Sequence, residues 1–449
     1  MGEQKGALLF SNKNLYKLIL PLIIEQVLTV TVGMADSIMI ASVGEAAVSG
    51  VSLVDTVNVL LINVFSALAT GGAVVAGQFI GSRKKELACK SADQLLMFVT
   101  GLAVAVMLLV YAGKYFILHV VFGQIAPDVM GHANTYLLIV SMSIPFIALY
   151  NAGAALFRAM GNSRISMATS LIMNLVNIAG NAILIYGVKL GVAGAAIPTL
   201  VSRILASIII VALLRDPTLT IHISRPFRFK LDFTLIKRIL RIGIPNGLEN
   251  SMFQLGKILV LSLVAGFGTA SIAANAVSNT VCQFQILPGM AIGLAMITVV
   301  SQCVGAGDYE QVRYNTKKLL KITHMALVVT NGIIFLILPF ILKAYNLSPE
   351  TAQMARDILI FHGSCSIFIW PISFTLPNAL RASSDVKYTM VISILSMWIF
   401  RIGFSYIIGK VLGLGVFGVW VAMVIDWVFR SICFVIRYRG HKWELLRNS

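Results

Sequence analysis

Asp36 is a carboxylate inside an apolar run, in the stretch GMADSIMI at residues 33–40. Glu25 lies eleven residues earlier, which on a 3.6-residue helix places it about 20° away, on nearly the same face. A carboxylate in apolar surroundings binds a proton more readily than one in water. The pair therefore predicts proton-coupled chemistry within a membrane. The alternative is a carboxylate that hydrogen bonds hold for packing alone.

A stripe of asparagines supplies predicted partners. Asn174, Asn177 and Asn181 are spaced i, i+3 and i+7 in NLVNIAGN, so they share one helix face. Three amides on one face of an intramembrane helix are unfavourable unless they meet each other, water or a ligand. We expect Asn177 and Asn181 to meet Asp36. Amide and carboxylate oxygens also suit a sodium ion, and hydrogen bonding between helices is the alternative.

Further polar groups lie in other apolar runs as candidate gating or substrate residues. Glu25 and Glu249 are expected near the inner mouth, where they gate the path or hold the structure together. Lys257 is expected to neutralise a carboxylate or contact substrate. Methionines give an adaptable lining where they face a cleft, and packing is the alternative. The remaining candidates of this group are Gln254, Met34 and Met173.

Other intramembrane charges suggest structural roles. SLVD at residues 52–55 has the spacing of a capping box, which predicts a helix start there. Asp426 and Arg430 are spaced i, i+4 and are expected to neutralise each other. Arg203 and Arg401 have no obvious partner in the sequence, and structural pairing is expected for both.

The elements that position these residues follow from composition. The chain has 449 residues, of which 58% are hydrophobic and only 12% charged. A soluble domain has about a quarter charged residues, whereas apolar runs of about 20 residues are typical of membrane spans. The five cysteines form no CxxC pair, and no Walker A, HExxH or GxSxG motif occurs. We expect neither an enzyme nor a cofactor.

The predicted architecture is an all-α polytopic membrane protein with twelve spans and both termini in the cytoplasm. The amino terminus, the even-to-odd loops and the tail hold 26 of the 35 Lys and Arg residues, and the opposite loops hold five. This bias explains the net charge of +17 through anionic lipid, not nucleic acid. The expected spans are 15–40, 52–80, 91–113, 133–157, 165–186, 193–214, 239–265, 275–305, 319–342, 355–380, 388–409 and 416–437.

An internal repeat divides the chain into two six-helix lobes. Because six is even, both lobes enter the membrane in the same sense, as parallel repeats do. We expect an amino-terminal lobe at 1–214, a cytoplasmic linker at 215–238 and a carboxy-terminal lobe with a basic tail at 239–449. At an offset of 224 residues, or 223 locally, the matches include Pro21 with Pro245, Glu25 with Glu249, Arg158 with Arg381, and Gly194 with Gly418.

The whole chain resembles the bacterial multidrug and toxic compound extrusion (MATE) transporters. The resemblance rests on LPLIIEQVLTVTVGMADSIMIASVG, QFIGSRKKE, ALFRAMGNSR and GNAILIYGVKLGVAGAAIPT. It implies a secondary antiporter of a cell membrane, here a bacterial inner membrane. Such proteins export amphiphilic, often cationic compounds by alternating access in exchange for H⁺ or Na⁺. The implied partners are small amphiphilic molecules and membrane lipids, with no nucleic acid, and a monomer is expected.

The resemblance also assigns residues. Asp36 matches the acidic coupling residue of the first helix, and Asn177 matches an asparagine of the amino-lobe cation site. Thr199 falls at the sixth-helix threonine of that site. Asn181 falls where many members have aspartate. This departure removes one negative charge, so a lone Asp36 favours protonation over a sodium site.

The branch within the family follows from missing acids. NorM-type members have acidic residues in helices seven and ten, where this chain has MFQLGK and IFIWPISFTLPNALR. The sequence is therefore closer to the DinF-type or a related branch, with the ion handled by the amino lobe. A lipid-linked precursor flippase of the same superfamily is the alternative. Twelve predicted helices, not fourteen, and few cations in the spans speak against it.

Overall fold

The computed structural model describes residues 9–223 and 230–448, so part of the predicted linker, 224–229, lies outside the described residues. The described chain is helical and contains no strand. Within the described residues, eleven helices are long and apolar enough to cross a membrane, and one bent pair raises the number to 12. The prediction of an all-α polytopic membrane protein is confirmed.

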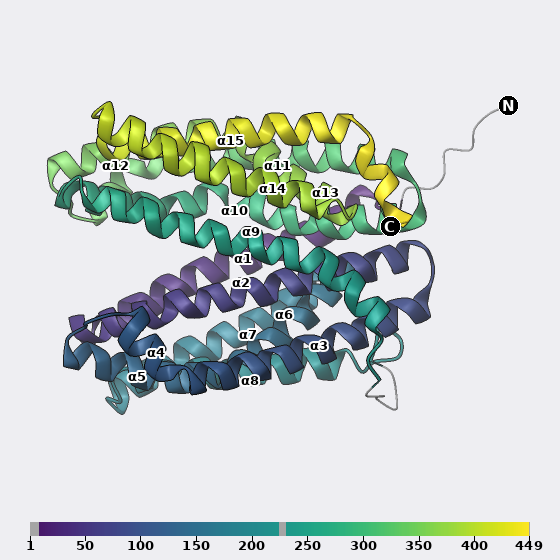
Figure 1. Cartoon of the computed structure of the whole chain (residues 1–449), viewed down its shortest axis with the longest axis horizontal. Helices are drawn as coiled ribbons and strands as arrows, with labels where there is room; N and C mark the ends of the chain where they lie inside the picture. The colour runs from purple at the N-terminus through teal and green to yellow at the C-terminus, as the bar shows by residue number, and fades with distance from the viewer. Residues whose placement is uncertain (1–8, 224–229, 449) are drawn as a thin grey trace. The chain divides into compact units, whose positions relative to one another are not determined.

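The chain forms two compact units. We call Leu20–Gly247 the amino unit, and Met1–Ile19 with Leu248–Ser449 the carboxy unit. The boundaries fall within the two helices α1 and α9 of Figure 1, close to Pro21 and Pro245. A proline inside a helix removes a backbone hydrogen bond and bends the helix. The repeat has therefore placed a proline at the same point of both first helices.

The helices of the amino unit run from the second part of α1 to the first part of α9 (Figure 1). Two of the helices continue into short π-helical segments, which we label η. The elements are α1 (Asn12–Ala41), α2 (Glu45–Gly81), α3 (Lys85–Ala112), α4 (Lys114–Phe116), η1 (Ile117–Val121), α5 (Pro127–Ser141), α6 (Ile144–Ala159), α7 (Ser163–Asn181), η2 (Ala182–Gly187) and α8 (Ala193–Leu213).

The predicted fourth span, 133–157, is a bent pair of helices. α5 and α6 meet at an angle of 48° after a break at Met142 and Ser143. Pro145 explains the break, since its ring clashes with the carbonyl of the residue four positions earlier, Ser141. The prediction of one continuous helix was wrong at this point.

The carboxy unit repeats this plan with longer helices (Figure 1). Its last span is followed by a short 3₁₀ helix. The elements are α9 (Phe233–Ala265), α10 (Thr269–Ala306), α11 (Tyr309–Ala344), α12 (Pro349–Trp370), η3 (Pro371–Thr375), α13 (Leu376–Ala382), α14 (Val386–Ser396), η4 (Met397–Gly403), η5 (Ser405–Val411), α15 (Gly415–Arg439) and η6 (Lys442–Asn448).

Matching glycines let the last two spans of each unit pack closely. A Cβ atom on Gly194 of α8 would lie 2.9 Å from the carbonyl carbon of Leu184 in η2. A Cβ atom on Gly418 of α15 would lie 2.9 Å from the carbonyl carbon of Ile408 in η5. Because backbone atoms cannot move aside easily, both positions exclude a larger side chain. The two glycines are repeat mates, so the repeat has kept this contact in both units.

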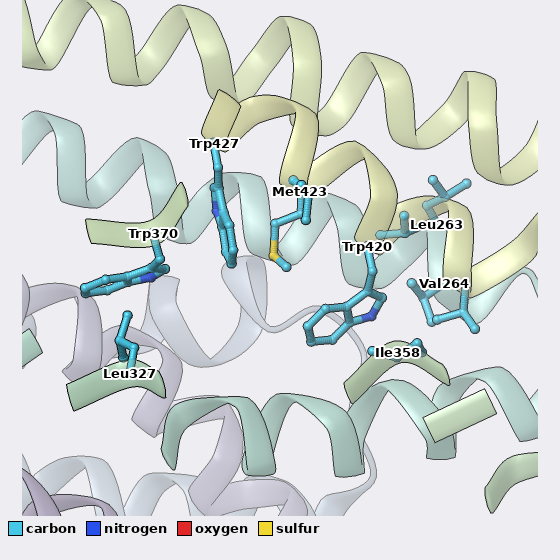
Figure 2. Close-up of a cluster of buried hydrophobic side chains, with 11 residues drawn as sticks. Leu263, Val264, Leu327, Ile358, Trp370, Trp420, Met423 and Trp427 are labelled. Carbon is cyan, nitrogen blue, oxygen red and sulfur yellow. The ribbon is translucent and has the colours of Figure 1, made fainter. Parts of the chain in front are cut away.

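A cluster of buried apolar side chains fixes α15 within the carboxy unit (Figure 2). Trp420 and Trp427 project from α15, and both are almost fully buried. Trp370 at the end of α12 and Leu327 on α11 belong to the same cluster. Leu263 and Val264 add α9 to it, so this cluster of large apolar side chains holds four spans together.

Candidate functional site

Three helices of the amino unit bring the predicted coupling residues together. Asp36 lies on α1, Asn177 and Asn181 on α7, and Thr199 on α8. The amide nitrogen of Asn181 donates a hydrogen bond to Asp36 Oδ1 at 2.7 Å. Asn177 and Asn181 are four residues apart on one face of α7, which explains why both reach the same carboxylate.

The second amide also faces Asp36. With its oxygen toward Thr199, the Asn177 amide nitrogen donates to Asp36 Oδ1 at 2.9 Å and lies 3.2 Å from Oδ2. The Asn177 oxygen then lies 3.1 Å from the Thr199 hydroxyl, which can donate to it or to the Ala195 carbonyl. Two amide donors on one carboxylate hold it in a fixed position. The third residue of the stripe, Asn174, donates instead to Ser170 Oγ at 3.3 Å.

One buried acceptor in this group has no partner. The side chain of Asn181 is 1% exposed, and its Oδ1 atom accepts no hydrogen bond among the described residues. An unpaired buried acceptor carries a free-energy cost of about 1–3 kcal/mol. A proton donor or a cation that enters the site would remove this cost.

Asp36, Asn181 and Thr199 line a cavity of about 180 Å³, which also contains a second carboxylate. This carboxylate is Asp55 on α2, and Tyr136 on α5 lines the same cavity. The Tyr136 hydroxyl donates a hydrogen bond to Asp55 Oδ1 at 3.1 Å. A volume of this size holds several water molecules. Two carboxylates in one such space are a feature of ion-binding sites.

Asp55 is a site residue that could not be predicted from the sequence. The spacing of residues 52–55 predicts a capping box, but α2 already begins at Glu45, so these residues lie inside the helix. The positive φ of 136° at Gly44 turns the chain before Glu45 and sets the earlier start. The capping prediction was therefore wrong. Tyr136 gave no signal, since a tyrosine in an apolar helix is most often core.

Arg203 places a positive charge near the carboxylates of the cavity. Arg203 on α8 donates through Nη1 to Ser143 Oγ at 2.8 Å. Its guanidinium interacts electrostatically with Asp36, Asp55 and Tyr136. The expected structural pairing of Arg203 is thus replaced by a hydrogen bond to Ser143 and longer-range attraction to both carboxylates. The described part of the chain has no cluster of three His, Cys, Asp or Glu residues that could hold a metal ion.

Glu25 lies in the amino unit but outside this cavity, within an ion pair. It accepts a hydrogen bond from Ser166 Oγ at 2.5 Å, and Arg158 Nη1 lies 3.6 Å from its other oxygen. Its repeat mate Glu249 makes the matching pair in the carboxy unit, where Arg381 Nη2 lies 2.7 Å away. Residues that the internal repeat matches thus form the same ion pair in each unit.

The remaining intramembrane charges of the carboxy unit differ from expectation. Asp426 accepts a hydrogen bond from Ser396, while Arg430 lies 3.7 Å from Glu249, so the predicted Asp426–Arg430 ion pair is not formed. Arg401 likewise makes no ion pair among the described residues. Its Cζ atom lies 4.9 Å from the centre of the Phe253 ring.

The other candidate residues are spread over both units. Met34 on α1 is exposed and Met173 on α7 is partly exposed. Neither belongs to the lining of the cavity around Asp36. In the carboxy unit, Gln254 is partly exposed and Lys257 is exposed, both on α9. The structure therefore gathers the four predicted coupling residues in one place but not the predicted gating and substrate residues.

The fold and site define a membrane transporter: two repeated helical units, with ionisable groups inside the spans and a small polar cavity in one unit. The MatE family model matches the chain twice, at residues 21–183 and 245–407. The chain belongs to this family, that of the MATE multidrug efflux transporters. The two matches are 224 residues apart, the offset that the repeat predicts.

Known proteins resemble the chain over almost its full length. The "Uncharacterized transporter YisQ" of Bacillus subtilis (strain 168) is 25% identical over 96% of this chain and 94% of its own. A "Probable multidrug resistance protein NorM" of Thermotoga maritima is 26% identical over 96% and 93%. A solved outward-facing MATE family transporter of the MOP superfamily has a TM-score of 0.90 at 21% identity and covers 97% of both chains.

Proposed function

We propose that the protein exports amphiphilic small molecules in exchange for protons, by alternating access, and that Asp36 carries the proton. The observation that carries this proposal is the position of Asp36, which lines a small polar cavity and is held by two amide donors. Ionisable residues inside membrane spans are commonly proton relays. Membership of a multidrug efflux family supports export of small molecules as the work that the proton drives.

The orientation of the amides supports a proton over a sodium ion. Both asparagine nitrogens point at Asp36, at 2.7 Å and 2.9 Å, so N–H groups occupy positions where a sodium ion needs oxygen ligands. The Asn177 oxygen is directed to Thr199. A sodium ion at Asp36 would require both amides to turn, whereas a proton requires neither to move.

The charges of the cavity fit one proton in each cycle. Asp36 and Asp55, both ionised, contribute two negative charges, and Arg203 contributes one positive charge close to them. The sum is one negative charge within the membrane spans, and a single proton neutralises it. Burial of an uncompensated charge is unfavourable, so the two states differ in their preferred solvent access. That difference is what alternating access requires.

Proteoliposomes with a preset gradient test the proposal. Addition of an amphiphilic dye should collapse a pH gradient in vesicles with the wild-type protein, and a sodium gradient of equal size should persist. Asp36→Asn should abolish the response, and Asp128→Asn, an exposed aspartate at the start of α5, serves as the matched control. Full activity of Asp36→Asn in correctly folded protein would contradict the role of Asp36.

A gain of sodium dependence is a second test of the same site. Asn181→Asp places a carboxylate, a favoured ligand of hard cations, where many MATE members have one by resemblance. We expect this variant to couple export to a sodium gradient, which the wild-type protein ignores. Sodium coupling in the wild-type protein would overturn the choice of the proton.

We also propose a bacterial inner membrane location with both termini in the cytoplasm, in contact with anionic lipid and as a monomer. The bias of 26 basic residues to one side supports this orientation. A carboxy-terminal fusion to alkaline phosphatase, which is active only outside the cytoplasm, should be inactive. An active fusion would reverse the orientation.

A further inference from the structure

Three cationic side chains of the carboxy unit surround one aromatic ring. The ring centre of Phe253 on α9 lies 4.9 Å from Arg401 Cζ, 5.7 Å from Arg430 Cζ and 5.9 Å from Lys257 Nζ. The cations come from η4, α15 and α9, which the fold therefore brings to one place. A face of Phe attracts a cation, but one ring compensates only a small part of three charges.

Only one of the three cations has a carboxylate partner. Arg430 lies 3.7 Å from Glu249, and its side chain is 2% exposed. Lys257 and Arg401 have no carboxylate within ion-pair distance among the described residues. Arg401 instead contacts the sulfur of Met423 through Nη2 at 3.1 Å.

The surrounding acids cannot balance the charge. The charged residues that these contacts and attractions join are four cations, Lys257, Arg381, Arg401 and Arg430, and two acids, Glu249 and Asp426. Four positive and two negative charges leave an excess of two. Glu249 is already shared by Arg381 and Arg430 at 2.7 Å and 3.7 Å. Asp426 attracts Arg401 and Arg430 only at longer range and is bound by Ser396.

The position of Lys257 shows that its ammonium is not a surface charge outside the membrane. It lies eight residues before the end of α9 at Ala265, which is about 12 Å along the helix axis. Even so, its side chain is exposed at the surface of the unit. An unpaired charge at such depth is found facing water or a ligand, not lipid. Lys257 and Arg401 also repel each other, as like charges beside one ring.

We infer that Lys257 and Arg401 bind an anionic group of the exported amphiphile, such as a carboxylate, phosphate or sulfonate, with Phe253 beside its apolar part. Arginine matches such groups through two parallel hydrogen bonds, and lysine adds a point charge. The inference rests on the proposed function and narrows its substrate class. The cargo is an acidic or zwitterionic amphiphile, where the family resemblance alone implies a cation.

A purely structural role explains Arg430 but not the other two residues. Arg430 lies between the rings of Phe253, Phe374 and Phe434 and is ion-paired, so its charge is compensated within the unit. Lys257 and Arg401 share one ring, and neither has a carboxylate within ion-pair distance in the described chain. Lys257 presents its charge on the exposed side of α9, where a ligand could reach it, and the partly exposed Arg401 of η4 contacts the same ring.

A matched pair of amphiphiles tests the charge preference. The purified full chain in phosphatidylcholine nanodiscs is titrated with decyl sulfate and with decyltrimethylammonium, which share a tail and differ in charge. We expect decyl sulfate to bind about tenfold more tightly, as a charge-assisted hydrogen bond allows. Lys257→Gln and Arg401→Gln should each remove this preference, and Lys410→Gln, an exposed lysine of η5, should not. Equal binding of both probes, or unchanged binding in both variants, overturns the inference.

Two further arms separate a transported anion from a lipid headgroup. In proteoliposomes, an anionic dye should drive proton exchange in the wild-type protein and in Lys410→Gln but not in Lys257→Gln. The wild-type protein is also tested for bound phosphatidylglycerol. If Lys257→Gln loses this lipid and the anionic dye drives no proton exchange in any variant, the site binds a lipid headgroup. That result would overturn the proposed substrate class. Proton exchange driven by a cationic dye alone would also overturn the inference, although the proposed function would stand.

Discussion

Each unit contains a Glu–Arg ion pair, and these two pairs are repeat mates. The nitrogen–oxygen distance is shorter in the carboxy unit, which gives a quantitative prediction for stability. Glu249 contacts Arg381 at 2.7 Å and Arg430 at 3.7 Å, and these side chains are 2–11% exposed. Glu249→Gln leaves two buried guanidinium groups without a carboxylate partner. The loss of one partner of a buried ion pair is unfavourable by about 3–5 kcal/mol. We expect the melting temperature to fall by about 4 °C.

The repeat mate serves as the matched control. Glu25 lies 3.6 Å from Arg158, and the Ser166 hydroxyl donates to it at 2.5 Å. In Glu25→Gln the amide oxygen can still accept from Ser166, so the cost should be about 1 kcal/mol, or about 1 °C. Thermal unfolding in one detergent, followed by tryptophan fluorescence, measures both variants.

A double-mutant cycle decides whether the loss of stability comes from the Glu249–Arg381 ion pair. Arg381→Gln alone should also destabilise the protein, but Arg381→Gln combined with Glu249→Gln should cost about 2 kcal/mol less than the sum of the single effects. A coupling energy below about 0.5 kcal/mol would refute the reasoning. So would a smaller effect for Glu249→Gln than for Glu25→Gln.

Three further predictions concern stability. Gly418→Ala should cost about 1–3 kcal/mol in thermal unfolding, since its Cβ atom would lie 2.9 Å from the backbone nitrogen of Gly409. Trp443→Ala should cost about 3–5 kcal/mol and release the carboxy-terminal segment to protease, because this side chain is 1% exposed. The hydrogen bond from Lys90 holds the pKa of Asp232 below its ordinary value, so this pair stabilises the fold above about pH 4 and ceases to do so as the pH falls further. Wild-type protein and Asp232→Asn should therefore differ slightly in melting temperature near pH 7 and not near pH 3.

Local spacing and repetition carried most of what could be predicted. Apolar runs predict the spans because backbone groups in lipid must be paired within a helix. The i, i+4 spacing of Asn177 and Asn181 correctly predicted that both side chains face Asp36, because the pattern lies within one helix and needs only one partner. The repeat likewise matched Glu25 with Glu249 before the structure placed each of them in an ion pair.

Contacts between distant segments could not be predicted in this way. Asp55 joins the cavity of Asp36 only because α2 begins at Glu45, and that start depends on the turn at Gly44. Arg430 has a closer acid in sequence, Asp426, but it pairs with Glu249, which is 181 residues away along the chain. Residue spacing within one helix cannot predict which residue on another helix becomes the partner.

The two units show how one scaffold supports two kinds of chemistry. Both keep the proline of the first helix, the Glu–Arg pair and the close glycine contact. The ionisable groups outside the pair have diverged. The amino unit has two carboxylates around its cavity, Asp36 and Asp55, whereas the carboxy unit has two cations without an acid, Lys257 and Arg401. In the function and anion site that we propose, a proton is exchanged at the first group and an anion is held at the second. The duplication would then separate the driving ion from the cargo.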